Sequence, residues 1–463
     1  MIPAAFGPAT DLDHLYLTLK PDPLEDPEEF KRFYRPVNDV RGGDTVARLS
    51  LKLQQAYRTL PFKAFLMGHP GVGKSTEITR LLGRVKDQHI GIRLSIATEL
   101  NPASFKVFDV LLLMLARLVE EADRLKTIPV GGIFERLATD IEQWFGTQQV
   151  RRTRTETTSA GVEAGAGLKG DSLLAGFLGL FANMKAEMKY ASDRKTETID
   201  YRLQRLPELV GLCNRLIDAC TETLIEKTGK EWLLIVEDLD KTGISPQQVQ
   251  ELFIQYGAVF QDLRASMIFT IPVWLAYSPE ANRLPFERHM INDTPVFTSN
   301  HEPHEKGRAA VQSVLEARVS PSVFAEGQMT RLIVASGGNL RELFALVLDA
   351  GEGARARNPD AVKIEGYDAE AAVNNMRRDY RMKLGQSPYD AAPIPYSEKF
   401  AKLVAVYNSS PDSDIPDPTL YSLLRGRAVQ EFNGAGWYGV HPLVVDILKD
   451  QAHLKPQDPG GTE

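Results

Sequence analysis

Apolar residues along the chain fall into short runs separated by longer segments of helical periodicity. Mostly apolar runs with the length of a buried strand occupy residues 64–67, 90–96, 232–236 and 266–271. Between and around them, segments with one apolar face predict helices at residues 46–57, 76–85, 105–124 and 206–220. Because strands that alternate with helices form parallel sheets covered on both faces, the pattern predicts an α/β fold.

Other segments depart from this alternation and divide the chain into further units. We expect an N-terminal lead-in that is extended and rich in proline and acidic residues, then a sheet-forming core with an inserted hairpin-like segment. A helical lid, a linker, a small module and a disordered tail follow. In chain order these units are residues 1–45, 46–330 with the insertion at about 146–200, 331–385, 386–395, 396–455 and 456–463.

The small module at residues 396–455 has the predicted element order helix, helix, strand, turn, strand, helix. The turn Asn433-Gly434-Ala435-Gly436 favours a hairpin, and the whole pattern resembles a winged helix. Arg425 and Arg427 are its only compact basic pair. Modules that read DNA use several basic contacts, so DNA binding and contact with another protein both stay open for this module.

Composition narrows the partners and the compartment. The chain has 54 basic and 61 acidic residues, so its net charge of −7 creates no global field that attracts nucleic acid. Cys213 and Cys220 are too few for a disulfide framework and are expected to share one buried helix face. The N-terminus lacks the pattern of a signal peptide, and no apolar run approaches the ~20 residues that cross a bilayer. The sequence therefore predicts a soluble, cytoplasmic protein.

The strongest chemical signal lies between the first predicted strand and the helix after it. The residues Gly68-His69-Pro70-Gly71-Val72-Gly73-Lys74-Ser75 match the phosphate-binding loop Gly-x4-Gly-Lys-Ser in full. Its glycines let backbone N–H groups surround the phosphates, and the helix that begins here adds partial positive charge. We expect Lys74 to reach the β- and γ-phosphates of ATP, Ser75 to offer its hydroxyl to Mg²⁺, and Thr76 to complete the site.

A second signal is the predicted strand 232–236, which is followed by Glu237, Asp238 and Asp240. Acidic side chains at the end of a buried strand beside such a loop can hold Mg²⁺ and orient the attacking water. The alternative is an ordinary core strand that ends in solvated carboxylates, and the upstream loop argues against it. We assign Glu237 to Mg²⁺ and Asp238 to the activation of water.

These two motifs, together with Ser336-Gly337-Gly338-Asn339-Leu340-Arg341-Glu342-Leu343, resemble the AAA+ superfamily. The closer resemblance is to its origin-initiator branch and to the related STAND switch ATPases. In those families the acidic strand often ends in Asp-Asp-Leu-Asp, so Glu237 is a departure that bears on the rate of hydrolysis more than on ATP binding. The resemblance implies a P-loop NTPase sheet with a helical lid, ATP and Mg²⁺ as cofactors, and assembly into a homo-oligomer or with a partner protein.

The resemblance also carries over single positions. Thr270 matches the polar residue placed between the two phosphate motifs, although a threonine that fills a strand fits the pattern equally well. Arg341 matches the lid arginine that contacts the γ-phosphate, and an arginine on a helix surface is the alternative. The resemblance further implies an arginine supplied by a neighbouring subunit, for which Arg283 and Arg288 are the candidates.

Two more patterns suggest sites but favour simpler interpretations. In His301-Glu302-Pro303-His304-Glu305, Pro303 disrupts a helical presentation of the histidines and no third ligand group is evident, so a surface loop is favoured over a metal site. The apolar segment at residues 173–181 could contact a membrane surface or a partner, or pack within its own hairpin. Lys185, Lys189, Arg194 and Lys195 flank it, yet membrane contact is the less favoured alternative.

Three functions follow from these patterns. The first is an ATP-hydrolysing molecular switch that assembles or changes conformation with Mg-ATP, as in bacterial defence or signalling. The alternative is a DNA-binding ATPase of the initiator or loader type that acts through the winged-helix-like module. A third is a scaffold that binds ATP with little turnover, since Glu237 stands where Asp is usual.

Overall fold

The computed structural model describes residues 7–56, 60–129, 132–145, 196–241, 243–390, 392–413, 415–432 and 437–451, and the isolated positions 179, 184, 186, 188 and 189. Most of the expected insertion at 146–200, including most of its apolar segment 173–181, lies outside these residues. The turn 433–436 and the tail at 456–463 lie outside them as well.

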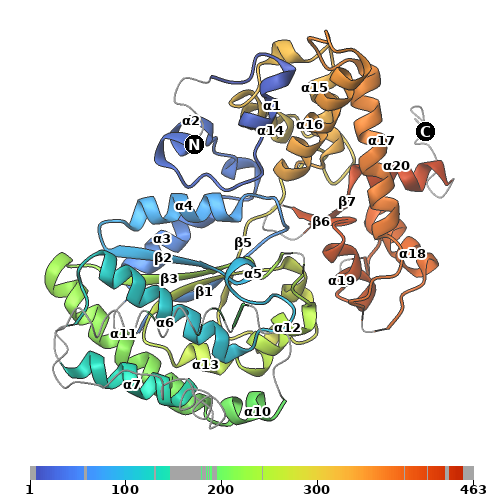
Figure 1. Ribbon diagram of the computed structural model, residues 1–463. Helices are drawn as coiled ribbons and strands as arrows, with labels where there is room; N and C mark the ends of the chain where they lie inside the picture. The colour runs from blue at the N-terminus through green and yellow to red at the C-terminus, as the bar shows by residue number, and fades with distance from the viewer. Residues whose placement is uncertain are drawn as a thin grey trace, which may run out of the picture.

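The centre of the protein is a five-stranded parallel sheet with the strand order β2-β3-β4-β1-β5 (Figure 1). The strands are β1 (Lys63–Met67), β2 (His89–Ser95), β3 (Glu231–Glu237), β4 (Ser266–Ile271) and β5 (Glu287–Met290). Every neighbouring pair runs parallel, so the carboxyl ends of the strands meet at one edge of the sheet. In open α/β sheets ligands bind at this edge. The predicted α/β fold is confirmed.

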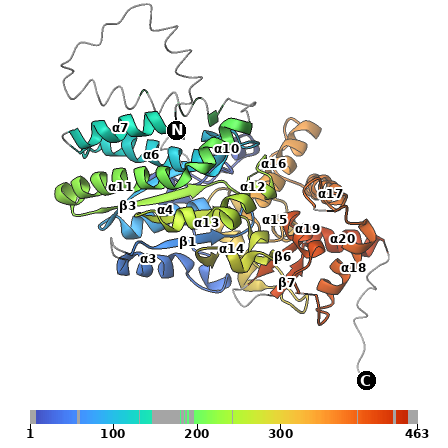
Figure 2. The same cartoon turned by 90° about the horizontal axis from the view of Figure 1, so that it is seen from below.

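Helices cover both faces of the sheet, because successive strand side chains point to opposite faces. On β1, Ala64 and Leu66 pack with helices α3 and α4, whereas Phe65 and Met67 belong to the core beneath α6 and α11. Figure 2 shows the sheet between these layers, with α7 against α11. The helices are α3 (Thr45–Gln55), α4 (Lys74–Val85), α6 (Val107–Arg124), α7 (Gly132–Phe145) and α11 (Leu206–Thr228).

Strand β5 is the one strand that the apolar pattern does not indicate. Its sequence is Glu-Arg-His-Met, and it lies at the sheet edge, where it pairs only with β1. An edge strand exposes much of its surface, so it needs no apolar run. Its position matters because the chain that leaves it, residues 291–294, passes directly behind the phosphate-binding loop.

The lid expected at residues 331–385 comprises the end of α15 (Gln328–Ala335), α16 (Leu340–Arg357) and α17 (Gly366–Lys383), and α14 (Glu305–Glu316) precedes it. The helical path is interrupted between α15 and α16, because Gly337 and Gly338 both adopt left-handed backbone angles. Asn339 then caps α16 by accepting a hydrogen bond from the Glu342 N–H. The interruption turns Asn339 toward the sheet.

The N-terminal residues, expected to be extended, are partly helical. They contain a 3₁₀ helix (Leu12–His14), α1 (Leu15–Thr18) and α2 (Pro27–Phe33). Leu12, Leu15 and Leu19 are buried, and Leu12 and Leu15 pack against α16 beside Gly351. These apolar residues explain why the segment is not extended throughout. The acidic and proline-rich stretch is short, and the apolar residues before it pack into the core.

The C-terminal module shows the expected order of elements. It contains α18 (Tyr396–Tyr407), α19 (Pro418–Arg425), β6 (Val429–Phe432), β7 (Trp437–Val440) and α20 (Pro442–Asp450). Strands β6 and β7 pair antiparallel, with Val429 opposite Val440. The segment expected as a linker packs onto the module, because its buried Asp390 forms ion pairs with Arg425 at 2.5 Å and Lys399 at 3.7 Å.

The remaining helices are short connections. They are α5 (Ile96–Glu99), α10 (Thr196–Gln204), α12 (Pro246–Gln250), a π-helix (Glu251–Gln255), α13 (Gly257–Gln261) and 3₁₀ helices at Asn38–Val40, Val273–Tyr277, Ala281–Arg283 and Pro321–Val323. Among the described residues, none of the helices has the length and apolar character needed to cross a membrane.

Cys213 and Cys220 are both buried on α11, as predicted, and burial raises the pKa of the Cys220 thiol to about 12.

Candidate nucleotide-binding site

The loop after β1 has the backbone geometry of a phosphate cradle. Gly71 and Gly73 have φ angles of 90° and 97°, in the left-handed region that side chains rarely adopt. A Cβ on Gly71 would also collide with the side chain of Asn339. Helix α4 begins at Lys74, directly after the loop, so its unpaired N–H groups open toward the same space.

Lys74 is held on both sides. Its Nζ donates hydrogen bonds to the carbonyl oxygens of Gly68 (2.8 Å) and His69 (3.0 Å), and to Asp240 Oδ2 (2.6 Å). The side chains of Lys74 and Asp240 are 7% and 8% exposed, so this is a buried ion pair. Asp240 therefore neutralises the charge of Lys74 in the nucleotide-free protein, a role that the acidic run alone does not indicate.

The three acidic residues at the end of β3 have different partners. Glu237 Oε2 accepts a hydrogen bond from Arg93 Nε at 2.5 Å, and Arg93 is on the neighbouring strand β2. Glu237 Oε1 is buried and has no hydrogen-bond partner among the described residues. Asp238 turns the other way, with a φ of 71°, and accepts a hydrogen bond from Ser95 Oγ at 2.5 Å. Only one oxygen of Glu237 is thus left for a cation.

Thr270, at the end of β4, positions this turn. Its Oγ1 accepts a hydrogen bond from the Asp238 N–H at 3.1 Å. Thr270 is 2% exposed, so its hydroxyl is more than a strand-filling group. The register of the sheet explains the contact. Strand β4 lies between β1 and β3, so its end is beside the loop after β1 and the turn after β3.

The lid brings Arg341 to the loop. Its Cβ would lie 2.7 Å from a Cβ on Gly71, which places the base of this side chain against the phosphate cradle. Arg341 is exposed and makes no hydrogen bond or ion pair with another described residue. A cation with no partner at this point is suited to a phosphate.

A cavity of about 740 Å³ unites these groups. Its lining contains loop residues Pro70–Thr76, the acids Glu237, Asp238 and Asp240, Thr270 and Arg341. The N-terminal segment closes another side: the Leu24 N–H donates to Thr76 Oγ1 (3.4 Å), and Tyr34 Oη donates to Glu77 Oε1 (3.1 Å). No local pattern indicates this contribution, because residues 20–35 reach the cavity through tertiary packing.

Val72 lines the cavity, whereas His69 does not line it and contacts Asp293 instead. His69 Nδ1 lies 2.6 Å from Asp293 Oδ2, and both side chains are almost fully buried. Burial alone would raise the pKa of Asp293, but the charge and hydrogen bond of His69 hold it below its usual range. Asn339 Nδ2 donates to the Pro70 carbonyl (3.0 Å), so the loop is clamped from behind by the lid and by the chain after β5.

Behind this clamp lies a buried charge cluster that joins the lid to the C-terminal module. Glu342 Oε1 accepts hydrogen bonds from Arg427 (2.8 Å) and Tyr380 Oη (2.9 Å), and His441 Nε2 lies 3.2 Å from Glu342 Oε2. Burial alone would raise the pKa of Glu342, but Arg427 and His441 lower it to about 2. We call Glu342, Tyr380, Arg427 and His441 the lid–module cluster.

Acidification is expected to weaken this cluster. The pKa of Glu342 is lowered from 4.5 to about 2, so its contribution to stability is complete above pH 4.5 and is lost as the pH falls toward 2. The contribution is on the order of 3 kcal/mol. Thermal unfolding of the wild type and Glu342→Gln at pH 6 and pH 3 checks this, because the gap between the two midpoints should narrow at pH 3. A gap that is equal at both pH values would contradict the assignment.

The module's basic pair is not a free basic surface. Arg427 belongs to the lid–module cluster and is 8% exposed, while Arg425 is paired with Asp390. The two arginines therefore give DNA no free basic pair, and DNA binding by residues 396–455 stays a prediction that rests on the winged-helix-like order of elements. Of the candidates for an arginine that acts on a neighbouring subunit, Arg288 donates to the Ala276 carbonyl and Arg283 ends a 3₁₀ helix, and nothing in the single chain distinguishes them.

The two histidines of the 301–305 segment have structural partners. His304 caps α14 by accepting a hydrogen bond from the Gly307 N–H at 2.9 Å. His301 stacks on the Tyr407 ring with 3.9 Å between centroids, and its Nε2 lies 2.9 Å from the Tyr407 carbonyl oxygen. These contacts explain both residues without a metal ion.

Comparisons with known proteins add a distant likeness. No protein-family model matches the sequence, and no curated protein matches it. Among solved structures, the chain is similar to Cdc6p from Pyrobaculum aerophilum, with 12% identity, a TM-score of 0.36, and 91% of this chain and 98% of that chain covered. It is also similar to a Walker-type ATPase of Pyrococcus abyssi, with 12% identity, a TM-score of 0.39, and coverages of 93% and 99%. Likeness at this level carries no argument about the site.

The class of the protein follows from its own geometry. A parallel sheet whose strand β1 leads through a left-handed glycine loop into α4, with Lys74 at the first turn and acidic residues after β3, has the fold and the phosphate-binding loop of the P-loop NTPases.

Proposed function

We propose that the chain binds Mg-ATP in the 740 Å³ cavity, hydrolyses it, and acts as a molecular switch that changes conformation or assembles with Mg-ATP. The observation that carries the proposal is the position of Lys74. It is fixed at the first turn of α4 by two loop carbonyls, at the carboxyl edge of a parallel sheet, with the unpaired Arg341 facing the same cavity. Two cations and the amide-lined loop suit a polyphosphate.

The residues present fit a magnesium ion. Ser75 supplies a hydroxyl and Glu237 supplies its unpartnered Oε1, and both line the cavity. In the described part of the chain no three His, Cys, Asp or Glu residues are grouped to hold a metal by themselves. That agrees with Mg²⁺, which takes phosphate oxygens and water as its other ligands. When bound, the ion would neutralise charge that develops on the phosphates.

The chain's own residues would then divide the work of hydrolysis. Asp238 accepts hydrogen bonds at its carboxylate, so it can orient a water molecule and take its proton, and Thr270 fixes the backbone of Asp238. Lys74 and Arg341 would stabilise the charge on the transferred phosphoryl group. Catalysis of this kind depends on positioning and electrostatics.

The switch follows from where Arg341 and Asn339 sit. Both belong to the first turn of α16 or its cap, and both lie against the loop. A γ-phosphate that attracts Arg341 would favour the lid conformation in which Arg341 lies against the loop. A ligand shifts a conformational equilibrium only when it binds one conformation more tightly than the other. The same turn leads to the lid–module cluster, so lid movement would reach the C-terminal module.

Asp238→Asn is the variant that tests the proposal. It should bind ATP with an affinity close to wild type but turn it over about 100-fold more slowly, because it keeps the cavity and loses the proton acceptor. Particle mass with and without Mg-ATP is the measurement. The variant should accumulate in ATP as a defined multiple of the 51.5 kDa chain or as a compact monomer with altered sedimentation.

Asp87→Asn serves as the matched control, since Asp87 is exposed beyond the end of α4, away from the cavity. It should behave as wild type in both measurements. Unchanged turnover in Asp238→Asn would sink the catalytic assignment. Identical mass and sedimentation with and without saturating ATP would sink the switch.

A further inference from the structure

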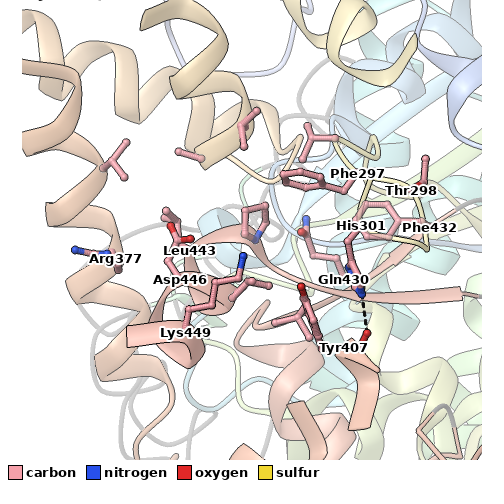
Figure 3. Close-up of a pocket in the computed structure, with 18 of the residues that line it drawn as sticks. Phe297, Thr298, His301, Arg377, Tyr407, Gln430, Phe432, Leu443, Asp446 and Lys449 are labelled. Atoms are coloured by element: carbon pink, nitrogen blue, oxygen red, sulfur yellow. Dashed lines mark hydrogen bonds between the residues drawn. The ribbon is translucent and has the colours of Figure 1, made fainter. Parts of the chain in front are cut away.

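A second cavity, of about 550 Å³, lies where the lid, the C-terminal module and the loop after β5 meet (Figure 3). Its lining comes from residues 296–301, from α15 and α17 of the lid, and from α18, β6, β7 and α20 of the module. It shares no lining residue with the nucleotide cavity. Its volume is typical of sites for small molecules.

The walls of this cavity are apolar and aromatic. Phe297 lines one side, and Phe432 and Trp437, stacked with 4.6 Å between ring centroids, line another. Val334 and Leu443 add aliphatic surface from the lid and from α20. Aromatic and aliphatic walls of this kind favour a ligand with a bulky apolar body.

Two charged side chains and a buried amide line the same space. Asp446 and Lys449 stand one turn apart on α20, and neither forms an ion pair or hydrogen bond with another described residue. Gln430 is fully buried, its Nε2 donates to the Gly337 carbonyl, and its Oε1 has no partner in the described part of the chain. Figure 3 shows Asp446 and Lys449 beside Leu443, with Gln430 and Phe297 on the other side of the cavity.

We propose that this cavity binds a small zwitterion with an apolar body, of the type of a large apolar amino acid. Lys449 meets the carboxylate of the ligand, and Asp446 meets its ammonium group. A ligand with a single charge would bring that charge close to a like charge on α20, whereas a zwitterion complements both. The site is independent of the nucleotide cavity and of its assigned function.

L-tryptophan and L-leucine are the probes, titrated calorimetrically into the full chain with Mg-ADP present to fill the nucleotide cavity. At least one of them should bind with a Kd below about 10 mM. Tryptamine, which lacks the carboxylate, and indole-3-propionate, which lacks the ammonium group, should each bind about 10-fold more weakly than L-tryptophan. Absence of binding by both amino acids, or equal affinity for L-tryptophan and its analogues, overturns the proposal.

Variants locate the binding. Val373→Trp fills the cavity from α17 and should abolish binding, whereas Met382→Trp, on the exposed surface of the same helix, should leave it unchanged. Lys449→Met should weaken L-tryptophan about 10-fold but leave tryptamine unchanged, because tryptamine has no carboxylate to lose. Asp446→Asn should have the reverse pattern, weakening L-tryptophan but not indole-3-propionate. These two substitutions are at exposed positions, so they test the site even if Val373→Trp fails to fold. Affinities that none of these substitutions alters would place the binding elsewhere and overturn the proposal.

Discussion

Lys74→Ala is expected to abolish ATP binding and, in addition, to destabilise the nucleotide-free protein. Binding is lost because Lys74 is the cation that the Gly68 and His69 carbonyls hold at the first turn of α4 beside the cavity. Stability falls because Asp240, 8% exposed, would keep its charge without its partner. Leaving one member of a buried ion pair unpaired costs about 3–5 kcal/mol. Thermal unfolding without nucleotide and equilibrium ATP binding measure the two effects.

The double variant Lys74→Ala with Asp240→Asn separates these effects. Removing the charge of Asp240 should recover most of the lost stability, while ATP binding stays absent. A single variant as stable as wild type would show that the Lys74–Asp240 pair contributes nothing to the nucleotide-free state. Recovered ATP binding in the double variant would show that Lys74 is not needed for the phosphates.

Arg427→Met is expected to be the second strongest change, although it is far from any phosphate. Arg427 is buried in the lid–module cluster, and its loss leaves Glu342 with Tyr380 and His441 alone. The expected destabilisation is about 3–5 kcal/mol, and Glu342→Gln in the same chain should recover part of it. Denaturant unfolding of the four chains of this double-mutant cycle measures the coupling.

Arg378→Met, an exposed arginine on α17, is the control for Arg427→Met and should unfold as the wild type does. The single Arg427 variant should also become susceptible to protease near residues 386–395, since the module would separate from the lid more often. Independent, additive effects of Arg427→Met and Glu342→Gln would contradict the role of the cluster in joining the module to the lid.

The parts of the site that lie within one local stretch were predictable. The phosphate-binding loop needs glycines at left-handed positions and a lysine at the start of a helix, and the residues at 68–75 satisfy those needs without help from the rest of the chain. Strands β1 and β4 were equally accessible, because central strands buried on both faces need continuous apolar runs. Edge strand β5 has no such need and left no pattern.

The partners of the charged residues were not predictable. Glu237 and Asp240 differ by three positions in a similar acidic run, yet one meets Arg93 from β2 and the other meets Lys74. That choice depends on which strand lies beside β3 and on the direction of the turn that Asp238 begins at a φ of 71°. Neither is encoded in spacing along the chain.

Sequence alone determined the local elements: the α/β alternation, the glycine loop with Lys74, and the order of the helices and strands in the C-terminal module. These depend on backbone preferences and on apolar periodicity, which act over a few residues. Tertiary structure decided which charges are buried together, from His69 with Asp293 to Glu342 with Arg427. Burying a charge is favourable only when its partner is placed within hydrogen-bond distance, and here the partners come from segments tens to hundreds of residues apart.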